Sequence, residues 1–159
     1  MFAEEVKVDI DKNHPFLNNI STMFMFVNGE IIKYSKHELQ QAKGLKDTEL
    51  NKACENAILS GFNHVINGVE YHFSFDIEAQ INFQGSAKLL DDGVVEEIKW
   101  TVRNNGQYER ISINKSIMDE LTLVILQHKD ENISKYRDEL MPQVEDATTV
   151  EEVKKIEWQ

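Results

Sequence analysis

The histidines are the side chains best suited to bind a metal ion or to transfer protons near neutral pH. There are five of them. His64 and His72 are close together in a predicted hairpin, but its expected register directs their side chains to opposite faces. His128 lies near the apolar stripe of a predicted helix, where a histidine usually packs, and His14 and His37 have polar surroundings. The chain also lacks Cys-x-x-Cys, His-Glu-x-x-His and calcium-loop spacings, so we predict no metal site.

The single cysteine is the strongest candidate nucleophile. Cys54 lies among Ala53, Ala57 and Ile58 on a predicted inward face, where a thiol packs as a small apolar group. The acidic pairs Asp91-Asp92, Glu96-Glu97 and Glu151-Glu152 could act as general acid and base, but adjacent carboxylates at such positions are usually solvated. No Gly-x-Ser-x-Gly motif and no phosphate-binding loop is present. We therefore predict that the protein is not an enzyme and uses no cofactor.

Composition narrows the classes of partner. The chain has 159 residues, and 41% of them are hydrophobic. This is enough for one domain with its own core, or for one domain with a short arm. Its 28 acidic and 17 basic residues give a net charge of −11, which disfavours nucleic acid as a partner. No apolar run approaches the ~20 residues that span a bilayer, and the N-terminus lacks signal-peptide features. We expect no membrane partner and synthesis in the cytoplasm.

Three Asn-Gly pairs between β-branched and aromatic residues predict three β-hairpins. The pairs are Asn28-Gly29, Asn67-Gly68 and Asn105-Gly106. With two-residue loops, each of the last two hairpins has one apolar face and one more polar face. The predicted core-facing residues are Phe62, His64, Ile66, Val69, Tyr71 and Phe73 in the second hairpin, and Ile98, Trp100, Val102, Ile111 and Ile113 in the third.

The first hairpin differs because both of its faces are apolar. One face carries Met23, Met25, Val27, Ile32 and Tyr34, and the other carries Phe24, Phe26 and Ile31. The hairpin is either sandwiched inside its own domain or uses one face to meet another chain. Trp158, near the C-terminus, is either a packed residue or an anchor for a partner. The candidate partner-binding residues are Phe24, Met25, Phe26, Ile31, Ile32, Tyr34 and Trp158.

Helical patterns fill the intervals between the hairpins. We predict a helix from Ser35 to about Lys43 that Gly44 interrupts, then a second one, capped by Asp47 or Thr48, that stops at Gly61. Further helices are predicted after the cap Asp76, from Asn114 or Ser116 to Pro142, and after the capping boxes of residues 148–152. Three antiparallel β-hairpins alternating with helices, ending in a long and a short helix, indicate an α+β fold. We divide the chain into an N-terminal arm, residues 1–45, for attachment or oligomerisation, and a domain, residues 46–159.

From about Asp47 to Trp158 the chain resembles a domain family of unknown function found in bacteriophage tail and tail-fibre-associated proteins. The most specific signs are the strand Ile98-Lys99-Trp100 and the ending Ala147-Thr148-Thr149-Val150-Glu151-Glu152. The order of elements around them, with a hairpin at Asn67-Gly68 and a helix after Asp76, also matches. The resemblance implies a virion or tail-associated protein and carries over no catalytic residue.

Two functional hypotheses follow. The first is a structural component of a phage tail, baseplate or tail fibre, made in the host bacterial cytoplasm and located in the virion. It would bind other phage tail proteins and form a homo-oligomer within the assembly. The second is a non-virion phage or prophage protein, either a tail-assembly helper or an acidic inhibitor of a host protein, for which the net charge of −11 is suited.

Overall fold

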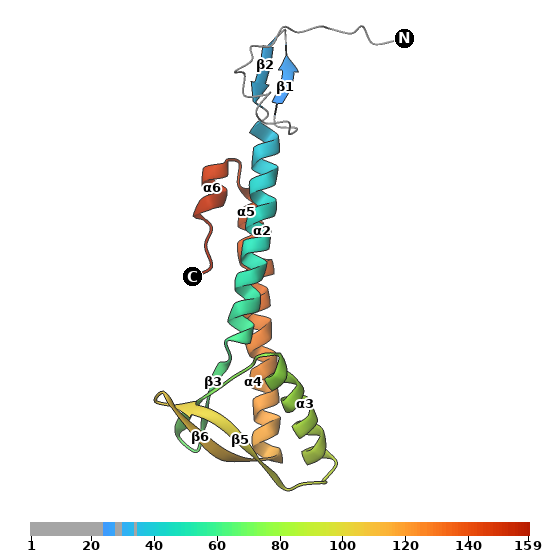
Figure 1. The fold of residues 1–159 in the computed structure, drawn as a ribbon, viewed down its shortest axis with the longest axis vertical. Helices are drawn as coiled ribbons and strands as arrows, with labels where there is room; N and C mark the ends of the chain where they lie inside the picture. The colour runs from blue at the N-terminus through green and yellow to red at the C-terminus, as the bar shows by residue number, and fades with distance from the viewer. Residues whose placement is uncertain (1–23, 28–29, 34) are drawn as a thin grey trace.

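The computed structural model describes residues 24–27, 30–33 and 35–159, with side chains from residue 36 onward. Figure 1 shows an elongated molecule with a sheet at one end and paired helices along its length. The elements, in chain order, are β1 (Phe24–Val27), β2 (Glu30–Lys33), α2 (Ser35–Leu59), β3 (Phe62–Ile66), β4 (Val69–Phe73), α3 (Ile77–Asp91), β5 (Glu97–Asn104), β6 (Gln107–Asn114), α4 (Lys115–Ser134), the π-helix η1 (Lys135–Leu140), α5 (Met141–Asp146) and α6 (Val150–Lys155).

The last two predicted hairpins join into one antiparallel sheet with the strand order β3-β4-β5-β6. Their registers match the prediction, since Phe62 pairs with Phe73 and Ile98 pairs with Ile113. Asn67 and Asn105 have φ values of 52° and 47°, as tight turns of the predicted kind require. The α+β class is thus confirmed, with two hairpins merged into a single four-stranded sheet.

The first hairpin forms a separate two-stranded sheet, β1-β2. Its register pairs Met25 with Ile32 and Phe26 with Ile31, as the Asn-Gly turn predicts. The side chains of both strands, and Tyr34 altogether, lie outside the described residues. The roles proposed for Phe24, Met25, Phe26, Ile31, Ile32 and Tyr34 in partner binding therefore stay predictions.

The main core lies between one face of the four-stranded sheet and helices α3 and α4 (Figure 1). Phe73 is fully buried, and its ring stacks on Phe62 with centroids 5.5 Å apart. Phe83 of α3 and Leu121 of α4 close the core from the helical side. We call this region the aromatic end. Its inward residues match those predicted from strand alternation, because alternate strand residues point to the same face. Val69 is the exception: it is 38% exposed, since it lies beside the turn at the end of its hairpin.

A second core holds the helices together. Here α2 runs antiparallel to the path through α4, η1 and α5, and α6 packs against α2 (Figure 1). The buried residues of this second cluster are Leu50, Cys54, Tyr136, Leu140 and Val144. We call this region the helical end.

The predicted interruption at Gly44 is wrong, because α2 is one continuous helix of 25 residues. A glycine inside a helix costs about 1 kcal/mol relative to alanine, which tertiary contacts can offset. One such contact lies next to the position, where Lys43 Nζ donates to the Glu145 carbonyl at 2.5 Å, and within the helix Lys46 pairs with Glu49 at 2.9 Å. The division proposed at residue 45 falls inside this helix and stays a prediction.

Pro142 does not end the long helix as predicted. The helical path continues through η1 into α5, where Pro142 occupies the first turn. Met141 donates its N–H to the Tyr136 carbonyl, five residues earlier. Such π-type turns are wider than α-turns, so the path accommodates a residue that lacks an N–H and whose ring would clash with an α-helical carbonyl. The predicted caps Asp76, Asn114 and Thr149 are confirmed. The predicted cap at Asp47 or Thr48 is wrong, because both residues lie inside the continuous helix α2.

Candidate functional site

Strands β4 and β5 pair over only a small part of their length. β4 has five residues and β5 has eight, and the two strands pair at His72 and Arg103. After Phe73 the chain turns away toward α3. The first half of β5 therefore has an open edge within the described sheet, although β5 is an inner strand by its order.

The register around the Asn105-Gly106 turn shows which backbone groups face this edge. Asn104 and Gln107 flank a two-residue turn and form a hydrogen-bonded pair. Hydrogen-bonded and non-hydrogen-bonded pairs alternate along an antiparallel ladder, so Thr101 and Lys99 direct their N–H and C=O groups away from β6. Arg103 has the same parity, in agreement with its pairing to β4. The open edge thus offers backbone groups that no neighbouring strand pairs, although the Lys99 carbonyl accepts a hydrogen bond of 3.5 Å from the Arg110 guanidinium.

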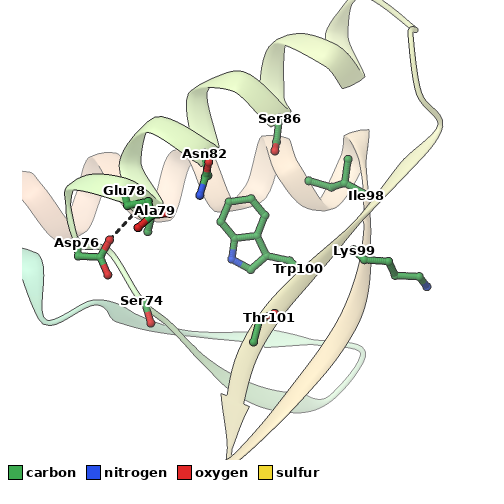
Figure 2. A pocket seen from close by; sticks show the side chains of 10 residues that line it. All are labelled: Ser74, Asp76, Glu78, Ala79, Asn82, Ser86, Ile98, Lys99, Trp100 and Thr101. Carbon is green, nitrogen blue, oxygen red and sulfur yellow. Dashed lines mark hydrogen bonds between the residues drawn. The ribbon is translucent and has the colours of Figure 1, made fainter.

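A groove of about 420 Å³ lies beside this edge, between β5 and α3. Figure 2 shows the Trp100 side chain pointing from β5 toward α3, with Asn82 and Ser86 on the helix above it. The Trp100 ring packs on Phe83 at a centroid distance of 4.2 Å and remains half-buried. Its indole N–H makes no hydrogen bond with the described residues, so it is free to donate to a ligand.

The helix wall of this groove is fixed at its start. Asp76 caps α3 by accepting a hydrogen bond of 2.8 Å from the Ala79 N–H. The Gln80 side chain donates to the Phe75 carbonyl at 3.1 Å, and Phe75 itself is buried in the aromatic end. The turn from β4 into α3 is therefore anchored, and the groove is formed before any ligand arrives.

Residues 41–157 match the family described as Domain of unknown function (DUF4376). The chain belongs to this family. No curated protein and no solved structure matches the chain significantly. The matched segment starts six residues before the segment predicted to resemble tail-associated proteins, residues 47–158, and it ends one residue before that segment ends. The DUF4376 domain thus includes the whole groove and most of α2.

Strand alternation placed Trp100 of the DUF4376 domain on the core face, and the structure confirms that orientation. The groove was not among the predicted sites, because its open edge depends on where β4 leaves the sheet. One sequence signal was available: the residues with strand character are fewer around Asn67-Gly68 than around Asn105-Gly106. A shorter hairpin cannot cover the full length of its longer neighbour.

The structure separates the histidines of the domain, as their predicted faces require. His64 Nε2 lies 3.6 Å from Glu120 Oε2 on the inner side, while His72 Nδ1 lies 2.9 Å from Asn63 Oδ1 on the outer side. His128 packs against Phe62 and Phe75 and contacts the Ile58 carbonyl with Nε2 at 3.1 Å. Among the described residues, no group of three or more His, Cys, Asp and Glu side chains could hold a metal ion.

Cys54 is packed in the helical end, as its sequence pattern predicts. It is 5% exposed, and its thiol donates a hydrogen bond to the Asn132 carbonyl at 3.4 Å. Burial raises the pKa of the Cys54 thiol, and the nearby Glu55 carboxylate raises it further, against the opposing effect of Arg137. A raised thiol pKa disfavours the thiolate that nucleophilic chemistry needs.

Trp158 packs against the buried cluster of the helical end and is half-buried. The Lys135 ammonium lies 4.9 Å from its ring centroid, a cation–π arrangement. These contacts account for the tryptophan structurally, and its proposed role as a partner anchor stays a prediction. None of the described helices is sufficiently long and apolar to cross a membrane.

Proposed function

We propose that the protein works by binding other protein chains, and that the groove beside β5 receives an extended segment of a partner. The observation that carries this proposal is the unpaired half of β5 next to the free indole N–H of Trp100. An extended peptide that adds to a sheet edge gains backbone hydrogen bonds, and adjacent pockets select its side chains. Trp100 would contribute the side-chain anchor, because aromatic residues dominate binding energies at protein interfaces.

The length of the open edge sets the size of the bound segment. From Glu97 to Thr101 it offers room for about four or five residues of an added strand at ~3.3 Å per residue. Asp76, Glu78 and Lys99 line the groove, and the Lys99 side chain points away from α3 (Figure 2). We therefore expect a segment with a basic residue beside an apolar one.

The biological setting of the proposal is a structural role in a phage tail, baseplate or tail fibre, with other tail proteins as partners and the virion as location. Its support is the likeness of residues 47–158 to tail-associated proteins. Mass spectrometry of purified phage particles tests this setting. Stoichiometric amounts of the protein support it. Its absence would favour the alternative, a non-virion assembly helper or an acidic inhibitor of a host protein.

A pair of proline variants tests the binding mode. Thr101→Pro removes an N–H from the open edge, whereas Tyr108→Pro removes one from the outer edge of β6, opposite Arg103 in the register. Displayed random peptides selected on the wild-type protein should bind Tyr108→Pro with unchanged affinity and lose at least tenfold on Thr101→Pro. Both variants must retain the wild-type circular dichroism spectrum.

Hydrogen exchange gives a second readout on the wild-type protein. A bound peptide should slow exchange of the Lys99 and Thr101 amides, because these groups are unpaired without it. Peptides that bind Thr101→Pro as well as wild type and leave both amides unprotected would reject strand addition at this groove.

A further inference from the structure

A small apolar pocket of about 160 Å³ lies between the neighbouring helices α3 and α4 (Figure 1). Its floor includes the rings of Phe75 and Phe83, which are 2% and 4% exposed and belong to the aromatic end. Ile125 of α4 and Ala87 of α3 add further apolar surface. None of the residues that line this pocket also lines the groove beside β5, so the two sites are separate.

Small or satisfied side chains leave the space between the two helices open. Ala87 contributes only a methyl group, and the Thr122 hydroxyl already donates to the Met118 carbonyl at 2.9 Å. Apolar walls gain dispersion contacts when an apolar group fills the space between them. An apolar cavity of about 150 Å³ is large enough for a benzene ring. The pocket therefore fits an aromatic ring or a branched chain of about six carbons.

The rim of the pocket carries a lysine without a carboxylate neighbour. The half-buried Lys129 has its ammonium 5.7 Å from the centroid of the Phe75 ring, a cation–π arrangement beside the pocket. Lys129 forms no ion pair with the residues that the structure describes. The positions three and four residues away on α4, where a helical ion pair would form, hold Ile125, Leu126, Asn132 and Ile133. In a chain with a net charge of −11, this ammonium is available to an external anion.

Two glutamine side chains complete the rim in different ways. Gln80 is held in place, because its amide donates to the Phe75 carbonyl at 3.1 Å. Gln84 is exposed, and its amide makes no hydrogen bond within the described part of the chain. A carboxylate accepts hydrogen bonds at both of its oxygens, and such bonds are strongest when the donor is charged. The Lys129 ammonium and the Gln84 amide are therefore suitable donors to a carboxylate at the rim.

We propose that the pocket between α3 and α4 binds a small apolar carboxylate. The aromatic ring or branched chain of this ligand enters between the helices, and its carboxylate lies at Lys129. Two sources present this chemistry, a free carboxylic acid and the C-terminal residue of a protein chain. Since the pocket admits a ligand of only about ten non-hydrogen atoms, the Kd is on the order of 1 mM. This inference does not rest on the function proposed for the groove beside β5.

Titration of phenylacetate into the isotope-labelled full chain, followed by NMR, tests the pocket. The backbone amide signals of Gln84 and Ala87 should shift and saturate with a Kd on the order of 1 mM. Phenylacetamide has the same shape without the charge, and acetate lacks the ring, so each should bind at least tenfold more weakly. Shifts that do not saturate by about 20 mM phenylacetate, or equal binding of phenylacetamide, would overturn the proposal.

Three variants assign the two parts of the ligand. Lys129→Gln should weaken phenylacetate binding at least tenfold and leave phenylacetamide binding unchanged. Lys52→Gln is the matched control, because Lys52 is a lysine of α2 that lies outside the pocket and pairs with Glu55 at 3.2 Å. It should bind phenylacetate as wild type does. Ala87→Leu should abolish saturable binding, because the larger side chain fills the pocket, and its circular dichroism spectrum should match that of wild type. Unchanged affinity in Lys129→Gln or in Ala87→Leu would contradict the proposal.

N-acetylphenylalanine distinguishes the two sources of the ligand. This probe carries the ring, the carboxylate and a preceding amide, as the C-terminal residue of a chain does. If it binds at least as tightly as phenylacetate, the ligand is a chain terminus. If it binds more weakly, the pocket excludes the preceding amide and the ligand is a free acid.

Discussion

The aromatic end and the helical end bury their interiors in different ways. At the aromatic end, Phe62, Phe73 and Phe83 form a cluster of rings between the sheet and α3. At the helical end, hydrogen bonds cross the interface: Tyr136 donates to Asp47, and Cys54 donates to the Asn132 carbonyl. The first region is held mainly by packed rings, with the His128 contact to the Ile58 carbonyl at its border, whereas the second adds buried side-chain partners that must match in position.

The largest effect should come from truncating a ring of the aromatic end. Phe73→Ala should lower the free energy of unfolding by about 3–5 kcal/mol, because it leaves a cavity in a fully buried site. Urea denaturation measures it. Tyr108→Ala is the control, since that ring is 74% exposed, and it should change stability by less than about 1 kcal/mol. Equal effects would contradict a core built around these rings.

Removing one tyrosine hydroxyl should lower the free energy of unfolding more at the helical end than at the aromatic end. Tyr136→Phe should cost about 1.5 kcal/mol, because the Asp47 carboxyl loses its donor. Tyr71→Phe, at the aromatic end, should be close to neutral, since the Tyr71 hydroxyl has no hydrogen-bond partner among the described residues. Urea denaturation of both variants compares them. If Tyr71→Phe were the more destabilising, the assignment of hydrogen bonding to the helical end would be wrong.

Two glycines, Gly44 inside α2 and Gly61 just after it, should respond in opposite directions. Gly44→Ala should raise the free energy of unfolding by about 0.5–1 kcal/mol, because a Cβ there meets no neighbour and alanine favours the helix. Gly61→Ala should lower it, because Gly61 has a φ of 95° and its Cβ would clash with the Phe73 carbonyl. Thermal unfolding would show the two shifts. A destabilising Gly44→Ala would argue against a continuous α2.

The smallest effect is a pH dependence at α6. The Glu152 carboxylate accepts hydrogen bonds from the Thr148 N–H, the Thr148 hydroxyl and the Thr149 N–H, and these bonds lower the pKa of Glu152. A lowered folded-state pKa stabilises the fold above the unfolded-state pKa, and this contribution is lost as pH falls through the folded value. Glu152→Gln should therefore be less stable than wild type at pH 7, and the difference should shrink as pH falls below the ordinary glutamate pKa of about 4.3 and through the lower folded-state pKa. Glu151→Gln should show a smaller change, since Glu151 only pairs with Lys154 at 3.7 Å.

The sequence determined the local structure and the inward faces of the strands. Asn-Gly pairs set the hairpin registers, and side-chain oxygens at Asp76, Asn114 and Thr149 set three helix starts, because turns and caps depend on neighbours in the chain. Tertiary packing decided the rest. The helix α2 continues through Gly44, where Lys43 donates a hydrogen bond to the distant Glu145 carbonyl. The π-turns before Pro142 allow the long helical path to continue past that residue. The groove beside β5 also arose at this level, since its open edge exists only because β4 leaves the sheet to begin α3. Local preferences amount to about 1 kcal/mol each, so packing between distant segments can override them.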